Sequence, residues 1–140
     1  MSGGRRPLGE GGSATVELVL LTPVLIVLLL FVVLAGRFSL ARNRVDEAAR
    51  DAAREASTWP TPMEAQTNGI ARGLASLDGG GVTCRGPAVI VDTARLHPGG
   101  EVVADVRCTV QVGDLVGLHV GGTREFRARA VAVVDTFRSG

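Results

Sequence analysis

Hydrophobic and polar positions divide the chain into an apolar run, an amphipathic helix and several alternating segments. From Leu18 to Gly36, 19 residues carry no charge, and Thr22 is the only polar one. As a helix this run would be about 28 Å long, close to the hydrocarbon thickness of a bilayer. A cleavable secretory signal has a shorter apolar core, followed by a small-residue cleavage site. The pattern therefore predicts a membrane anchor, and we place the transmembrane helix segment at residues 13–36.

The helical pattern continues beyond the apolar run, in a soluble segment that we place at residues 37–59. The sequence "RFSLARNRVDEAARDAAREAS" contains no Gly or Pro and is rich in Ala, Arg and Glu, which favour helix. Small and apolar residues recur in it at i, i+3 and i+4, which predicts one buried stripe. The stripe consists of Leu40, Val45, Ala48, Ala49, Ala52, Ala53 and Ala56. "TWPTP" ends this helix near Trp59, and a second, short helix is predicted from Met63 to Leu77.

The rest of the chain has the pattern of strands. "EVVADVRCTVQV" at 101–112 and "REFRARAVAVV" at 124–134 alternate between apolar and polar residues, as half-buried strands do. "AVIVD" at 88–92 supplies a third strand, and "HPGG" at 97–100 predicts a turn. The connection "VGDLVGLHVGGT" suits a single helical turn. Three short strands cannot bury both faces of a sheet, so one face should lie against the Ala-rich stripe.

The predicted fold class is therefore α+β. A long N-terminal helix, transmembrane in its first part and amphipathic in its second, precedes a small antiparallel sheet of about three strands packed on that helix. Residues 60–140 form the α+β head in this interpretation.

Charge and motifs exclude several classes of function. The net charge of +1 gives no global field that would attract nucleic acid. Cys84 and Cys108 lack CxxC spacing and nearby His ligands, so a metal site is not expected. A single disulfide in an oxidising compartment suits them, and two reduced core cysteines are the alternative. His97 and His119 have no nucleophile or acid at motif spacing and are interpreted as surface residues. No phosphate loop or nucleophile elbow is present, so we expect neither an enzyme nor a cofactor.

The start of the chain raises a separate question. Residues 1–12 are Gly-rich, contain two arginines and read as a disordered basic leader. They are followed by Ser13, by Glu17 at the edge of the apolar run, and by Pro23 inside it. A carboxylate near a bilayer costs free energy, and a proline removes one helical hydrogen bond. In the plainer interpretation, Glu17 only marks where the span begins or favours the first turn through the helix dipole. Gly12 would then be one glycine of a flexible leader, and Pro23 a tolerated kink.

The stretch from "GGSATVELVLLTPVL" through "DEAARDAAREAS", about a third of the chain, resembles the TadE-like minor pilins (pseudopilins) of the tight-adherence, type IV-like pilus system. The closing "RARAVAVVDTFR" is similar to the last strand of such proteins, though less specifically. The sequence departs from the family pattern at Leu18, where an aromatic residue is common.

The resemblance implies a mechanism of maturation and assembly. A membrane prepilin peptidase would cleave between Gly12 and Ser13, and Glu17 would pair with the new amino terminus of an adjacent subunit. Glu17 and Pro23 would then serve subunit assembly. The implied partners are the prepilin peptidase, other pilin subunits, the pilus assembly platform and membrane lipid. The implied location is a single-pass cell membrane protein with a cytoplasmic N-terminus and an extracytoplasmic head, in a pilus that serves cell adhesion. The alternative is an uncleaved, signal-anchored module that binds a ligand or acts as a sensor.

The distribution of arginines opposes this orientation. Two arginines precede the apolar run and five follow it within residues 37–59, so the positive-inside rule favours the opposite topology. The five are Arg37, Arg42, Arg44, Arg50 and Arg54. Acidic residues are interspersed among them, and both the expected disulfide and the leader favour a cytoplasmic N-terminus. We therefore expect the N-terminus to lie inside.

Overall fold

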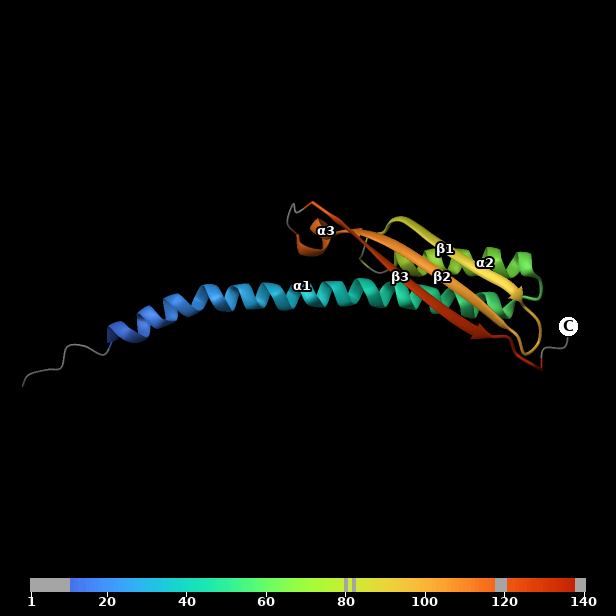
Figure 1. The fold of residues 1–140 in the computed structure, drawn as a ribbon, viewed down its shortest axis with the longest axis horizontal. Helices are drawn as coiled ribbons and strands as arrows, with labels where there is room; N and C mark the ends of the chain where they lie inside the picture. The colour runs from blue at the N-terminus through green and yellow to red at the C-terminus, as the bar shows by residue number, and fades with distance from the viewer. Residues whose placement is uncertain (1–10, 80, 82, 118–120, 138–140) are drawn as a thin grey trace, which may run out of the picture. The chain divides into compact units, whose positions relative to one another are not determined.

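The computed structural model describes residues 11–79, 81, 83–117 and 121–137 (Figure 1). In chain order the elements are α1 (Gly11–Thr58), α2 (Pro62–Asp78), β1 (Arg85–Arg95), β2 (Glu101–Gln111), α3 (Val112–Val116) and β3 (Thr123–Val133). By its contacts the chain divides into two compact units, Met1–Gly36 and Arg37–Gly140. The expected disordered leader lies outside the described residues, except for Gly11 and Gly12, which are helical.

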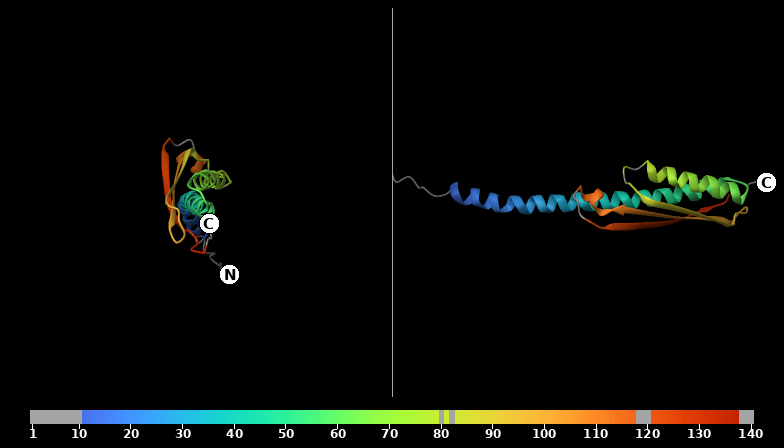
Figure 2. Two further views of the ribbon diagram at one scale, coloured as in Figure 1. Left: turned by 90° about the vertical axis from the view of Figure 1, so that its right-hand side faces the viewer. Right: turned by 90° about the horizontal axis from the view of Figure 1, so that it is seen from above.

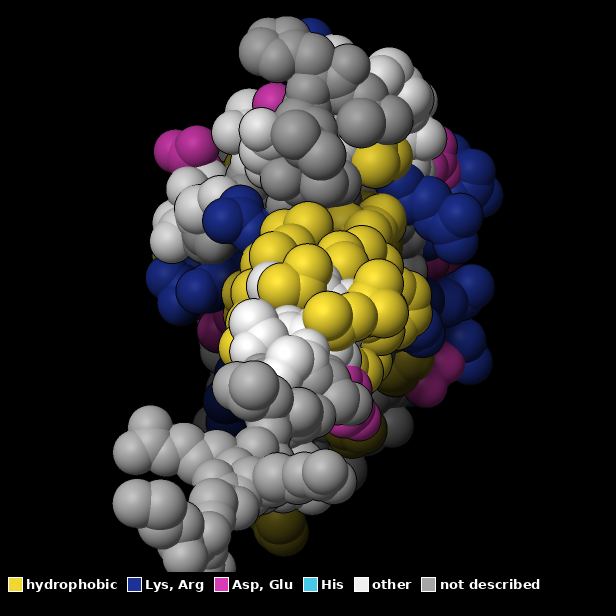
Figure 3. Space-filling view, turned by 90° about the vertical axis from the view of Figure 1, so that its left-hand side faces the viewer, with side chains coloured by type: hydrophobic (Ala, Val, Ile, Leu, Met, Phe, Trp, Pro, Cys, Tyr) yellow, Lys and Arg dark blue, Asp and Glu magenta, His cyan; other side chains and the backbone are white. Residues whose placement is uncertain are grey.

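The first unit contains the apolar part of α1. Among the described residues, α1 is the one helix long and apolar enough to cross a membrane; its most apolar window has a mean hydropathy of 3.2 and is not buried at all. Hydrophobic side chains gather on its surface (Figure 3). This surface has no partner within the described chain, so its burial requires lipid or another protein. The segment is a candidate single membrane span.

The second unit is built around a three-stranded sheet of order β1-β2-β3, in which both pairings are antiparallel. The part of α1 that follows Gly36 lies together with α2 against one face of this sheet (Figure 2). Val106 at the centre of β2 stands opposite Val89 of β1 and Ala128 of β3. The predicted fold class, α+β with a small antiparallel sheet packed on the long helix, is confirmed.

The core is a layer of valines from the sheet against a stripe of small residues from α1. Predicted stripe positions from Val45 to Ala56 are at most 1% exposed. Leu40 was wrongly included, because its side chain is 59% exposed and the neighbouring Ala41 takes its place. From the sheet, the largest fully buried side chains are Val102, Val106, Cys108 and Val110. Alanine lets the helix backbone approach the sheet, while valine fills the space between the layers.

The second helix begins at a side-chain N-cap, Thr61. Thr61 accepts a hydrogen bond from the backbone N–H of Glu64 at 3.3 Å, and its hydroxyl donates to the Glu64 carboxylate at 2.8 Å. Pro62 follows the cap, where a missing N–H costs nothing. The helix predicted from Met63 to Leu77 is confirmed, with one more residue at each end.

The strands differ from the prediction at their ends. β1 extends beyond the predicted 88–92 at both ends, and register shifts interrupt its pairing with β2 near each end. Gly86, with φ of 59°, lies in the first irregularity and breaks the alternation that the sequence would otherwise show. Val112 was expected to continue β2, but it begins the single helical turn of α3. The turn expected at 97–100 is present before β2.

The two helices of the second unit approach closely at glycines of α2. A Cβ added at Gly69 would lie 2.9 Å from Ala56 Cβ and 3.0 Å from the Ala52 carbonyl oxygen. One added at Gly73 would lie 3.0 Å from Val89 Cγ1. Both glycines are buried, and Gly69, which faces a backbone oxygen, admits no side chain at the present helix separation.

We predict that Gly69→Ala lowers the free energy of unfolding by about 1–3 kcal/mol, because α2 must move away from a backbone carbonyl that cannot yield. Urea titration of the full chain in detergent, followed by the fluorescence of Trp59, measures this change. Gly79→Ala is the matched control, since Gly79 has φ of −72° and an added Cβ meets nothing closer than 3.7 Å. Equal stability of the two variants would show that α1 and α2 are not packed so closely at Gly69 that a methyl group is excluded.

Candidate functional site

The candidate processing residues lie at the very start of α1. Gly12 and Ser13 belong to its first turn, and Glu17 follows four residues beyond Ser13. A Cβ added at Gly12 would meet nothing within 4 Å, and its φ is not positive. Neither close packing nor backbone conformation therefore requires glycine at this position in the described structure. A helical glycine instead costs about 1 kcal/mol relative to alanine.

Glu17 has no counterion in the described part of the chain. Its side chain is exposed, and none of the ion pairs among the described residues includes it. The nearest arginine within α1 is Arg37, 20 residues further along the sequence. A carboxylate at the edge of an apolar span is less costly when it is paired. Any group that neutralises it has to come from outside α1.

Pro23 lies inside α1, six residues after Glu17. It has no N–H, so the carbonyl of Val19 loses its usual helical donor. One residue earlier, Thr22 Oγ1 donates to the Leu18 carbonyl at 2.7 Å. The helix nevertheless continues through this position, as membrane helices with an internal proline can.

The two cysteines form a disulfide. Cys84 precedes β1, Cys108 lies on the inward face of β2, and their Cα atoms are 5.2 Å apart. Cys108 is 1% exposed, so the bond is anchored within the core. It closes a loop with a sequence separation of 24 residues. The predicted pairing is confirmed, and the described residues contain no free cysteine.

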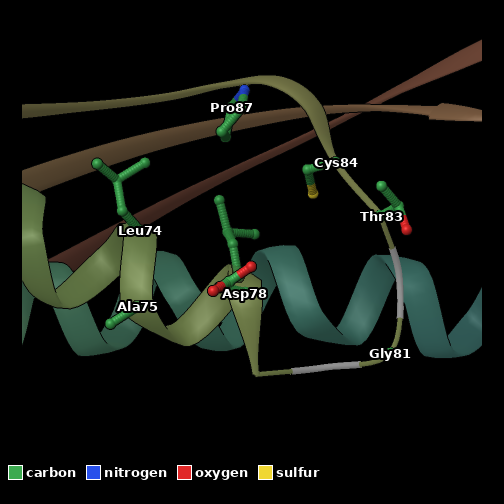
Figure 4. Close-up of a pocket in the computed structure, with 8 residues that line it drawn as sticks. Leu74, Ala75, Asp78, Gly81, Thr83, Cys84 and Pro87 are labelled. Atoms are coloured by element: carbon green, nitrogen blue, oxygen red, sulfur yellow. The ribbon is translucent and has the colours of Figure 1, made fainter.

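A cavity of about 580 Å³ lies beside this disulfide (Figure 4). Its lining consists of Leu74, Ala75, Leu77, Asp78, Gly81, Thr83, Cys84 and Pro87. Asp78 supplies the one carboxylate in this lining and Thr83 the one hydroxyl, and both residues are exposed.

The histidines and acids form no metal-binding group among the described residues. His97 is exposed in the turn before β2, as predicted, and His119 lies outside the described residues. No group of three or more His, Cys, Asp or Glu side chains is placed to hold a metal ion in the part of the chain that the structure describes. The other candidate residues from the sequence, Gly12, Ser13, Glu17 and Pro23, lie in the N-terminal part of α1.

Comparison with known proteins bears on this segment. The family model of TadE-like proteins matches residues 12–54. Residues 12–54 are similar to TadE-like proteins. The resemblance stated from the sequence is thereby confirmed over these residues. The TadE-like segment begins at Gly12, contains Ser13, Glu17 and Pro23, and ends within the Ala-rich stripe, before α2 and the sheet. No curated protein and no solved structure matches the chain.

We predict that Cys84→Ser with Cys108→Ser lowers the free energy of unfolding by about 3 kcal/mol, because the open loop gains entropy in the unfolded chain. Urea titration with and without reductant measures the loss. Reductant should destabilise the wild type and leave the double variant unchanged. Mass mapping of non-reduced protein from the cell envelope tests the bond directly, and two free thiols there would contradict it.

Proposed function

We propose that this chain is a minor pilin (pseudopilin), a structural subunit for assembly of a tight-adherence, type IV-like pilus. It acts through packing and interaction, and not as an enzyme. The observation that carries the proposal is that the TadE-like match, the apolar span and the unpaired Glu17 fall on the same helix. Its proposed partners are a prepilin peptidase, other pilin subunits and the pilus assembly platform.

The two parts of α1 support different tasks. The part beyond Gly36 already buries its small residues under the head, from Ala41 to Ala56. The span buries none of its most apolar window. Contacts with other subunits are therefore available along the span, where the alternatives are lipid or another helix.

In this proposal, pairing of Glu17 sets the axial register between neighbouring subunits. After cleavage between Gly12 and Ser13, the new α-amino group of a neighbouring subunit would carry the positive charge that α1 lacks near Glu17. Opposite charges attract more strongly near a low-dielectric bilayer than in water. The carboxylate then becomes less costly only when subunits are correctly staggered along their axes.

Cleavage has to open one turn of helix. Gly12 and Ser13 are helical in the structure, whereas a peptidase draws an extended segment into its cleft. Gly11 and Gly12 weaken this turn, because glycine disfavours helix by about 1 kcal/mol per residue. A glycine pair at the end of the helix therefore lowers the free-energy cost of local unwinding.

We further propose a cytoplasmic N-terminus and an extracytoplasmic head. The Cys84–Cys108 disulfide supports this orientation, since such bonds persist in oxidising compartments. The arginines after the span oppose it by the positive-inside rule. We give the disulfide more weight because it belongs to the folded core of the head.

We predict that Gly12→Leu blocks processing in cells that carry a prepilin peptidase. The precursor should then remain about 1 kDa heavier than the mature chain, the mass of some 12 residues, because a bulky side chain obstructs the cleft beside the cleaved bond. N-terminal sequencing of the membrane-extracted protein measures this. Gly36→Leu is the control, since a Cβ there also meets nothing within 4 Å. Normal cleavage of Gly12→Leu would overturn the proposed site.

We predict that Glu17→Leu is inserted and cleaved like the wild type but loses co-isolation with other pilins by tenfold or more. Removing the carboxylate eases insertion and abolishes the pairing. Glu17→Asp, one methylene shorter, should be intermediate, and the neighbouring Val16→Leu should be neutral. The measurement is recovery of pilin partners with the mature protein at equal expression. Undiminished recovery for Glu17→Leu would reduce this residue to a marker of the membrane edge.

A further inference from the structure

One end of the second unit is tied by the chain to the end of the span. Only Arg37 separates Phe38 from Gly36, the last residue of the first unit. The ring of Phe38 contacts that of Phe126 on β3, with ring centroids 6.3 Å apart. The start of β3, distant in sequence, is therefore held beside the first turn of α1 that belongs to this unit.

Three exposed arginines gather at this end. Arg37 and Arg42 are on α1, and Arg124 is two residues before Phe126 on β3. Alternation along a strand puts Arg124 on the same face of β3 as Phe126, and so on the side of α1. None of the three forms an ion pair among the described residues.

Acidic residues do not cancel this charge. Arg44, the next arginine on α1, pairs with Glu47 at 3.3 Å. Asp114 in α3 is an exposed acid and forms no ion pair within the described chain. Asp46, one turn beyond Arg42 on α1, forms none either. Three unpaired arginines against these two acids leave a positive excess at this end.

Some arginines farther from the span are matched by acids. Ion pairs join Arg72 to Asp51, Arg95 to Glu101 and Arg127 to Glu125. The others on the described part of the second unit form no ion pair: Arg50, Arg54, Arg85, Arg107 and Arg129. What distinguishes Arg37, Arg42 and Arg124 is therefore their place, at the end of the second unit that the chain joins to the span.

We propose that Arg37, Arg42 and Arg124 together bind the phosphate groups of anionic phospholipids where α1 leaves the bilayer. Guanidinium groups donate paired hydrogen bonds to phosphate oxygens and remain charged at every physiological pH. The attraction of an anionic bilayer for a basic group falls off within a Debye length. The chain connection to the span keeps this end of the second unit within that distance of the bilayer surface. Arg124 makes this a contact of the folded head and not only of the helix that crosses the membrane.

Lipid selectivity of the full-length protein tests the proposal. We would reconstitute it in bilayers of phosphatidylcholine and phosphatidylglycerol and measure the relative association of spin-labelled forms of the two lipids. Wild type should prefer phosphatidylglycerol. The preference should fall by up to about fivefold for each arginine replaced in Arg37→Gln, Arg42→Gln and Arg124→Gln, and should approach unity in the triple variant.

The matched control is Arg50→Gln with Arg54→Gln, which removes two exposed arginines from the same helix but farther from the span. It should keep the preference. Sodium phosphate should weaken the preference no more than sodium chloride of equal ionic strength, because the site faces a bilayer and is not a pocket for free phosphate. A triple variant that keeps the wild-type preference, a silent Arg124→Gln, or a control as defective as the triple variant would each overturn the proposal. The measurement needs no peptidase and no pilin partner, so its outcome is independent of the proposed function.

Discussion

The close approach of α1 to the rest of the second unit is the constraint on which the fold depends. Alanines on α1 and glycines on α2 bring two helix backbones together, and Ala52 meets both Gly69 and Gly73. The valines of β2 then reach across to the same helix and complete one core. Small residues gain little by their own burial, so the stability comes from the valines that close packing allows to be buried. The disulfide adds a covalent tie where β2 meets the chain before β1.

Much of this arrangement was predictable from the sequence, because each element has a clear period. The apolar run marks the candidate span. The i, i+3, i+4 stripe shows which side of the helix is buried, and the alternation in β2 and β3 does the same for the strands. Predictions failed where local geometry breaks the period. The bulges hid the true length of β1, and the stripe begins at Ala41 because residue 40 is turned about 100° from it around the helix. The contact of Phe38 with Phe126 had no signal, since it depends on how β3 lies along α1.

The candidate site at the N-terminus was located from sequence, while the structure shows what it lacks. Glu17 is exposed and unpaired within the described chain, and the span around it is not buried. Both features describe a helix whose interactions are completed by other molecules. Sequence alone could mark the carboxylate as costly but could not show that none of the ion pairs among the described residues includes it. The head instead uses its ion pairs within itself, as between Arg72 of α2 and Asp51 of α1.

The position of the disulfide has a mechanical consequence. A chain pulled through its two ends transmits tension along the backbone, and an S–S bond removes the enclosed loop from that path. The separation of 24 residues between Cys84 and Cys108 corresponds to roughly 80 Å of extended chain. All of β1 and most of β2 lie inside the locked loop, whereas β3 and the helices lie outside it. Under load on the two chain ends, β1 and most of β2 therefore stay out of the stretched length, and any extension of the head comes from its helices, β3 and the segments that join them.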